Sequence, residues 1–313
     1  MKKEIIPIIY STDENYVPCL AVSLTSLKVN RSKRYNYRII VLHSNVGEKM
    51  QQRILKLSSK GFKIEFVSVK DYMGELETSA VLRDYYTYTT YYRIFISKMF
   101  PTLNKAIYLD CDTVIVSDIS KLYEVDIKDY YLAAVPDGAV GAVEPFQEYT
   151  EKVLGINYTN YFNAGMLLMN LEKLRNEGFY TRFIELMTAH SFIVAQDQDY
   201  LNVLCKDKTL FLDETWNMMP IKASNLENEI MPNIIHFNLT LKPWHYKGIM
   251  FEKYFWKHAK ETCFYRHLLS IRRNYSKANI EKDSMCESKL IEMCKSEVDN
   301  PNNYYSLSIG TIL

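Results

Sequence analysis

Residues 105–118 read KAIYLDCDTVIVSD: an apolar run of strand length leads into two carboxylates, and a second β-branched run follows them. Side chains two positions apart in an extended chain point to one face, so Asp110 and Asp112 project together from the carboxyl end of the first run. Ligands of open α/β sheets bind at that edge, and carboxylate oxygens suit a hard cation such as Mg²⁺ or Mn²⁺. The alternative is a pair of solvated aspartates in a turn. The spacing alone is not specific, since Asp197 and Asp199 repeat it.

Short apolar runs and amphipathic stretches alternate on both sides of this segment, from residue 5 to residue 205. The alternation is typical of an α/β fold. We expect strands at 5–10, 37–43, 62–69, 105–109, 113–116, 131–135, 164–170, 210–213 and 233–237. We expect helices from 15 or 18 to 29 and at 47–59, 91–99, 178–190 and 197–205. The polar, tyrosine-rich stretch 71–90 is long enough to be a functional loop or lid.

The overall composition restricts the class of protein. With 38 Lys and Arg against 37 Asp and Glu, the 313-residue chain has a formal charge of +1, and no bulk field points to a nucleic-acid partner. Hydrophobic residues make up 48% and charged residues 24%, as in globular proteins of this size, which bury roughly 75% of their unfolded surface. The six cysteines are scattered, as expected of reduced thiols. The sequence also has no apolar run of about 18 residues and no small-residue cleavage site, so we expect a cytoplasmic protein.

The composition changes near residue 250, where we expect the boundary between an α/β domain, 1–250, and a helical C-terminal region, 251–313. Between 251 and 277, seven Lys or Arg and two Glu are interleaved with Tyr, Phe and Trp. Clustered basic and aromatic side chains favour peripheral contact with an anionic bilayer, here at the inner face of the membrane. The alternative is a helix pair that packs its aromatic rings on the domain and exposes its charges.

Two common phosphate-binding motifs, G-x-G-x-x-G and G-x-x-x-x-G-K-[ST], do not occur in the sequence. Their absence argues against dinucleotide redox chemistry and against a P-loop. We therefore expect any phosphate to be bound by a metal ion and side chains.

Six sequence blocks follow one another in an order that resembles glycosyltransferase family 8, the retaining group that includes bacterial lipopolysaccharide galactosyl- and glucosyltransferases and glycogenin. The resemblance extends over about residues 5–246. It implies a GT-A catalytic domain, which is a Rossmann-like, nucleotide-binding α/β domain with a mixed central sheet that binds a UDP-sugar and Mn²⁺ at its carboxyl edge. The blocks are YSTDENY (10–16), TTYYRIF (89–95), YLDCDTVI (108–115), YFNAGMLLMNL (161–171), QDQDYLN (196–202) and HFNLTLKPWH (236–245).

The resemblance implies roles for the last block and for the two aspartates of the third. His236 would join Asp110 and Asp112 as a metal ligand, and Lys242 would contact the departing diphosphate. An imidazole beside two carboxylates favours Mn²⁺ over Mg²⁺, although a lone histidine at a strand end can equally be structural. Relatives commonly carry a Gly-Pro turn before the lysine, whereas residues 238–241 read NLTL, which leaves the backbone path there open.

The donor itself would contact residues of the other blocks. Asp13 and Asn15 can satisfy the N3–H and a carbonyl of uracil, or they can cap the following helix. By resemblance, the sugar pocket would comprise Arg93, Asn163, Ala164, Gly165, Asp197 and Gln198. Without the resemblance, Arg93 could be a helix-surface cation, Asp197 an N-cap and 163–165 a turn. Residues 85–92, YYTYTTYY, read as half core and half lid, with sugar stacking as an alternative.

These expectations define a reaction. Departure of UDP leaves positive character on the sugar and negative charge on the phosphate. The amide oxygen of Gln198 is a poor nucleophile, so retention favours attack from the face that UDP leaves, with a phosphate oxygen taking the acceptor proton and Gln198 stabilising the positive charge. A double displacement through Asp197 is the alternative.

The sequence therefore predicts a Mn²⁺-dependent (or Mg²⁺-dependent) retaining hexosyltransferase that uses UDP-galactose or UDP-glucose and a glycan, glycolipid or glycoprotein acceptor. One rival is a catalytically idle UDP-sugar-binding scaffold, which the intact Asp110, Asp112, His236 and Lys242 oppose. Another is a glycogenin-like enzyme that glucosylates its own tyrosine, for which the chain offers 25 candidates. The sequence leaves the hexose, the acceptor, the linkage and the oligomeric state open.

Overall fold

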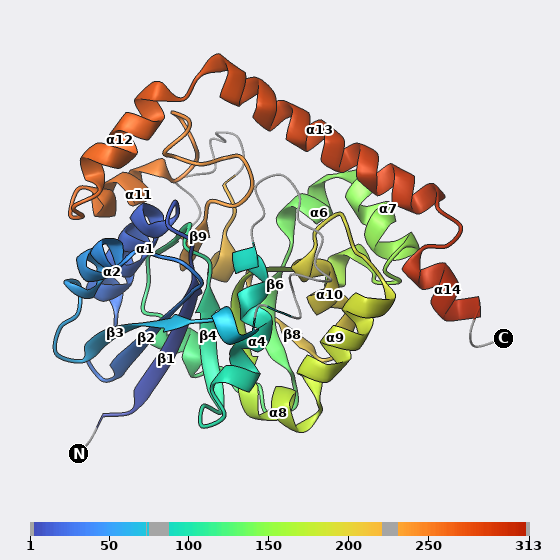
Figure 1. Cartoon of the computed structure of the whole chain (residues 1–313), viewed down its shortest axis with the longest axis horizontal. Helices are drawn as coiled ribbons and strands as arrows, with labels where there is room; N and C mark the ends of the chain where they lie inside the picture. The colour runs from blue at the N-terminus through green and yellow to red at the C-terminus, as the bar shows by residue number, and fades with distance from the viewer. Residues whose placement is uncertain (1–2, 73, 75–87, 221–230, 311–313) are drawn as a thin grey trace.

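Seven strands form one mixed sheet in the computed structural model, which describes residues 3–72, 74, 88–220 and 231–310 (Figure 1). The strand order is β3-β2-β1-β4-β7-β6-β8, and only β7 runs against the others. The mixed sheet predicted from the sequence is thus confirmed. The strands are β1 (Ile5–Ser11), β2 (Asn36–His43), β3 (Phe62–Ser68), β4 (Lys105–Leu109), β6 (Leu132–Pro136), β7 (Phe162–Asn170) and β8 (Thr209–Phe211).

The two remaining strands form a separate pair. β5 (Thr113–Ile115) and β9 (Ile234–His236) are antiparallel, with Thr113 opposite His236. Segments more than a hundred residues apart in the sequence therefore meet directly beyond the carboxyl end of β4.

Both faces of the main sheet are buried, because successive strand side chains point to opposite sides. Ile8 packs into the apolar cluster that contains α1, and Ile9 packs into the cluster that contains α4. The helices predicted up to residue 205 are confirmed, and shorter ones were not foreseen. In the described part of the chain before residue 250, the helices are α1 (Val17–Asn30), α2 (Glu48–Leu55), α4 (Tyr92–Met99), α5 (Ser120–Tyr123), α6 (Gly138–Ala142), α7 (Glu144–Lys152), α8 (Leu171–Asn176), α9 (Phe179–Ala189) and α10 (Asp197–Leu204).

Helix α1 shows how sequence and packing agree. Pro18 lies in its first turn, where a missing N–H costs nothing. Every residue from Val17 to Leu27 is buried, so the helix lies between the sheet and other helices rather than at the surface.

The C-terminal region is helical, as predicted. Its elements are α11 (Glu252–Ala259), α12 (Tyr265–Asn274), α13 (Lys277–Asp299) and α14 (Tyr304–Gly310). Phe255 and Leu268 belong to the same apolar cluster as α1. The long helix α13 then crosses the molecule from α12 to α7 (Figure 1). The predicted division of the chain into two regions at residue 250 stays a prediction. Residues from both sides of this position belong to one apolar core.

The aromatic rings of the basic segment 251–277 point largely inward. Phe255, Trp256 and Phe264 are buried, and Arg272 stacks on Trp256, 4.2 Å from the ring centre. Most of the basic side chains are exposed. This arrangement favours the alternative in which the helices pack their rings on the domain, and membrane contact through the exposed charges stays a prediction. Among the described residues, no helix combines the length and the apolarity needed to cross a bilayer.

The tyrosine-rich stretch is described only in part. Residues 85–87, with the stacking role considered for them, lie outside the described residues. Residues Tyr88–Tyr91 form a single 3-10 turn that leads into α4, and Tyr91 and Tyr92 are buried. This part of the run therefore belongs to the core.

Candidate active site

A cavity opens at the carboxyl ends of β1 and β4, bounded by α6, α10 and the loop that follows β9. Asn15 is exposed and does not contribute to its wall. The other site residues predicted from the sequence all line the cavity: Asp13, Arg93, Asp110, Asp112, Asn163, Ala164, Gly165, Asp197, Gln198, His236 and Lys242.

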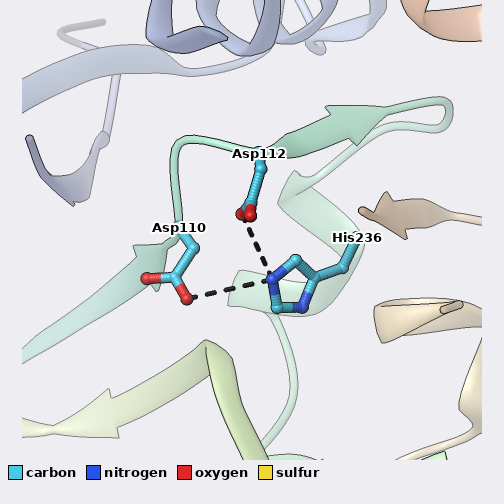
Figure 2. Close-up of side chains that lie close together, drawn as sticks. All are labelled: Asp110, Asp112 and His236. Atoms are coloured by element: carbon cyan, nitrogen blue, oxygen red, sulfur yellow. Dashed lines mark ion pairs between the residues drawn. The ribbon is translucent and has the colours of Figure 1, made fainter. Parts of the chain in front are cut away.

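Three ligand-type side chains converge inside the cavity (Figure 2). Asp110 directly follows β4, Asp112 directly precedes β5, and His236 ends β9. Their candidate ligand atoms lie within 4.8 Å of one another. His236 Nε2 is 3.2 Å from Asp112 Oδ1 and 3.9 Å from Asp110 Oδ2. The pairing of β5 with β9 therefore produces the constellation that the sequence predicted.

Gly165 on β7 makes this close approach possible. A Cβ at this position would lie 2.1 Å from His236 Cε1 and 2.8 Å from Asp110 Oδ2. The Gly165 carbonyl also accepts a hydrogen bond from the Asp110 backbone N–H at 2.8 Å. A glycine is required here because two of the converging side chains occupy the space that any side chain would need.

A chain of hydrogen bonds fixes the tautomer of His236. The Gly165 N–H, which can only donate, bonds to Asn163 Oδ1 at 3.0 Å, and Asn163 Nδ2 donates to Asp137 Oδ2 at 2.9 Å. The Asn163 amide therefore has one orientation, and Asn217 Nδ2 donates to its oxygen at 2.9 Å. Asn217 Oδ1 is left to accept from His236 Nδ1 at 3.1 Å. Neutral His236 thus carries its proton on Nδ1 and presents the lone pair of Nε2 to the two aspartates.

These residues fit a divalent metal ion. Asp112 Oδ1 is buried and accepts no hydrogen bond from the described residues. This oxygen lies 3.2 Å from His236 Nε2, which presents a lone pair to it. The lone pairs of the carboxylate oxygen and of the imidazole nitrogen repel each other, and a cation bound to both atoms would stabilise the arrangement. Two carboxylates and one imidazole suit Mn²⁺.

Lys242 lies on the other side of Asp112. Its buried ammonium group donates to Asp112 Oδ2 and to the carbonyl oxygen of Phe237, both at 2.5 Å. Burial alone would raise the pKa of the Asp112 carboxyl, but the positive charge of Lys242 opposes burial, and this pKa lies below its usual range. Asp112 is therefore ionised and ready to bind a cation.

The loop before Lys242 reads NLTL where the resemblance led us to expect a Gly-Pro turn. Leu239 adopts a φ of +49°, in the left-handed region that disfavours side chains with a Cβ. The Lys242 backbone N–H then bonds to the carbonyl of Thr240 at 2.7 Å. The NLTL sequence thus follows a strained local path and still delivers the lysine into the cavity.

Arg93, in the first turn of α4, forms ion pairs with both Asp110 and Asp197 in the cavity. Its Nη2 is 3.3 Å from Asp110 Oδ1, its Nε is 3.0 Å from Asp197 Oδ2, and Nη1 donates to the Ala164 carbonyl. With 4% of its surface exposed, Arg93 is not a helix-surface cation. Burial raises the pKa of Asp197 to about 7, and the Arg93 charge acts in the opposite direction.

The segment Asp197–Gln198–Asp199 opens α10, where Gln196 is the N-cap residue. Asp199 is fully buried and accepts from Tyr149 at 2.9 Å, from Tyr161 at 2.6 Å and from a backbone N–H. Asp199 therefore stabilises the packing of α10 against the neighbouring tyrosines, whereas Asp197 faces the cavity.

Gln198 is held by both ends of its amide. Its Oε1 accepts from the Ala164 N–H at 3.0 Å, and its Nε2 donates to Asp137 Oδ2 at 3.1 Å. Since the backbone N–H can only donate, the amide orientation is fixed. The group is placed in advance of any ligand, as a stabilising residue must be.

At the end of the cavity next to β1, Asp13 stabilises the turn before α1. Its Oδ1 accepts from the backbone N–H groups of Asn15 at 2.8 Å and Tyr16 at 3.1 Å. Tyr16 lines the cavity beside Asp13. Both N–H groups precede α1, whose N-cap residue, Tyr16, receives no side-chain capping bond, so Asp13 closes a turn rather than capping the helix. The wall position beside Asp13 belongs to Tyr16 rather than to Asn15.

Two buried residues of the site were not predicted. Asp137 directly follows β6, whose carboxyl end lies at the same edge of the sheet as that of β4, so the strand-end rule that selected Asp110 could have found it. Asn217 ends an isolated 3-10 turn and follows no periodic pattern, and no sequence signal marks it.

Comparison with known proteins agrees with this geometry. Residues 7–248 match the sequence model of glycosyl transferase family 8. The chain is 34% identical to a Haemophilus influenzae protein that bears a glycosyltransferase name, over 77% of this chain and 73% of that protein. It is 27% identical to lipopolysaccharide 1,2-glucosyltransferase of Escherichia coli K12, over 83% of this chain and 78% of that protein.

A solved structure shows the same fold. The galactosyltransferase LgtC, in complex with donor and acceptor sugar analogues, superimposes with a TM-score of 0.70 at 24% identity, over 84% of this chain and 100% of that one. The mixed sheet and its flanking helices are therefore GT-A-like. Because the family model covers well over half of the sequence, this chain belongs to glycosyl transferase family 8.

Proposed function

We propose that this family 8 glycosyltransferase is a retaining hexosyltransferase that transfers galactose or glucose from a UDP-sugar to a carbohydrate-containing acceptor with the help of Mn²⁺. The observation that carries the proposal is the convergence of Asp110, Asp112 and His236 in one cavity with Arg93 and Lys242. The names of the relatives, a glucosyltransferase and a galactosyltransferase, support a hexose donor.

The two ends of the cavity suit the two ends of a nucleotide sugar. Asp13 and Tyr16, at the end of β1, are available to the uracil base. A metal ion bound by the three ligands would neutralise the diphosphate. Lys242 bonds to Asp112 and therefore lies within reach of the same phosphates, where its charge stabilises the leaving group.

The sugar would lie between Arg93 and Gln198. Arg93 orients Asp197, whose carboxylate can then accept hydrogen bonds from sugar hydroxyls. Gln198 Oε1 uses one lone pair on the Ala164 N–H and keeps the second for positive charge that develops at the anomeric carbon. An amide oxygen is a poor nucleophile and Asp197 is already paired, so we propose attack by the acceptor on the face that UDP leaves.

The first test is a hydrolysis panel that needs no acceptor. Purified protein is incubated with UDP-galactose, UDP-glucose, UDP-N-acetylglucosamine and GDP-mannose, with Mn²⁺ or with EDTA, and the release of nucleotide is measured. We expect release from a UDP-hexose with Mn²⁺ and its loss with EDTA. Binding of UDP without release from any donor would instead support the idle scaffold.

The glycogenin-like rival is tested in the same incubation. Self-glucosylation would add the mass of one or more hexoses to the intact protein. We expect no mass gain, because Tyr108, Tyr149 and Tyr161 of the cavity wall have their hydroxyls engaged by aspartates. The fourth described tyrosine of the wall, Tyr16, lies at the end assigned to the uracil base, away from the sugar.

A further inference from the structure

The cavity has an apolar end that the donor does not account for. Val140 of α6, Phe146 of α7, Val194 before α10 and Leu290 of α13 all line it. This end lies next to Gln198, because Asp137 both caps α6 and accepts a hydrogen bond from Gln198 Nε2. A molecule bound there would lie beside the anomeric carbon of the donor sugar placed above.

Leu290 reaches the cavity from beyond residues 7–248, which match the family. It lies on one face of α13, together with Asp283, Glu287 and Cys294, since residues three or four apart share a face of a helix. This face points toward the body of the protein: Asp283 and Cys294 are buried, and Leu290 is half-buried.

Specific contacts hold α13 in place on both sides of Leu290. Asp283 accepts hydrogen bonds from Tyr246 at 2.6 Å and from Tyr275 at 2.7 Å, and Glu287 accepts from the Thr240 hydroxyl in the loop that carries Lys242. Toward the other end, Cys294 packs into the apolar cluster that includes residues of α7. The helix thus spans the distance from the Lys242 loop to α7 (Figure 1), with Leu290 over the cavity between them.

We propose that α13 forms one wall of the acceptor subsite, and that Leu290, with Val140 and Phe146, packs against the apolar C–H face of an acceptor pyranose ring. A pyranose has an apolar face and a polar rim, and aromatic and aliphatic side chains bury the former while the latter stays free to react. The acceptor is accordingly the terminal pyranose of a glycan. This inference rests on the proposed transferase function.

The test compares Leu290→Ser with Met285→Ser. Met285 is on the same helix but 70% exposed and outside the cavity wall, so it serves as the matched control. The probes are the UDP-hexose that the wild type hydrolyses and a panel of p-nitrophenyl α- and β-glycosides as acceptors. Transfer, hydrolysis and the acceptor KM are measured for each protein, and thermal unfolding reports on folding.

We expect Leu290→Ser to raise the acceptor KM and to lower the ratio of transfer to hydrolysis, each about tenfold, because the contact of one aliphatic side chain is lost. Met285→Ser should match the wild type in every measurement. Leu290→Trp, which fills the same space instead of emptying it, should abolish transfer to the glycosides.

An unchanged acceptor KM in both Leu290 variants would overturn the inference. So would donor hydrolysis by the wild type that no glycoside in the panel diverts into transfer, because the wall is assigned to a pyranose. Absence of hydrolysis with every donor would contradict the proposed function itself, which is a separate result.

Discussion

The chain contains two D-x-D segments with the same spacing and different surroundings. Asp110 and Asp112 lie between the end of β4 and the start of β5, and both carboxylates face His236 inside the cavity. Asp197 and Asp199 open a helix, where Asp197 pairs with Arg93 in the cavity and Asp199 is buried against Tyr149 and Tyr161. The backbone that presents the two carboxylates decides their function: the short turn between β4 and β5 points both into one site, whereas the first turn of α10 separates them.

The largest effect should follow a change in the first segment. Asp112→Asn keeps an oxygen for Lys242 but removes the negative charge of a proposed metal ligand. We expect Mn²⁺-dependent donor hydrolysis to fall by more than about 100-fold, because loss of a partner outside the ligand set alone costs about 10–100-fold. Asp126→Asn, on the exposed surface, should retain wild-type turnover. Chelator-sensitive activity near the wild-type level in Asp112→Asn would remove this residue from the metal site.

Gln198→Ala probes the residue between the two aspartates of the second segment. Because Gln198 is assigned to charge that develops during the reaction, kcat should fall by about 100-fold while UDP affinity changes little. Calorimetry with UDP and Mn²⁺ gives the affinity, and steady-state kinetics gives kcat. A proportional loss of UDP affinity would make Gln198 a binding residue and leave the proposed mechanism without its stabilising group.

Asp199→Ala should affect folding rather than metal binding. It removes the acceptor of two tyrosine hydroxyls and of the Ala195 N–H, all in the interior. Each buried group left without a partner costs about 1–3 kcal/mol, so we expect a loss of about 3 kcal/mol or more in the free energy of unfolding. Denaturant titration measures this quantity. Unchanged stability would mean that the two D-x-D segments differ less than their contacts indicate.

Asn217→Leu tests the hydrogen-bond chain behind His236. Loss of the acceptor for His236 Nδ1 frees the ring to adopt the other tautomer. We expect Mn²⁺ affinity to fall by about 10–100-fold, as for other residues that orient metal ligands. The exposed Asn274→Leu serves as control. Equal Mn²⁺ affinity in both variants would show that Asn217 does not set the tautomer.

The strand and the two aspartates that follow it could be predicted from the sequence, but their contact with His236 could not. The apolar run 105–109 marks a strand, and the strand-end rule selects Asp110 and Asp112. His236 could be linked to them only through the resemblance to the family, because β5 and β9 pair across more than a hundred residues and no local pattern encodes that contact. Periodicity alone also did not separate the strand-end aspartates from Asp197 and Asp199.

Other parts of the site lay beyond sequence reasoning for different physical reasons. Asn217 acts through a single side-chain hydrogen bond, which leaves no periodic trace. Leu290 lies on a long helix of mixed composition, and its place over the cavity depends on the contacts of Asp283 and Glu287 with distant loops. Asn15 was placed in the site because an amide just past the first strand can satisfy a uracil carbonyl, yet the turn before α1 directs its side chain to solvent.

The central claim is that the first D-x-D segment, and not the second, binds the metal ion with His236. Titration of Mn²⁺ into the protein in the presence of UDP, followed by electron paramagnetic resonance of free Mn²⁺, tests it directly. We expect the wild type and Asp199→Asn to bind Mn²⁺ with affinities that agree within about twofold, and Asp112→Asn to bind more than about 100-fold more weakly. Wild-type affinity in Asp112→Asn, or an equal loss in Asp199→Asn, would contradict the account.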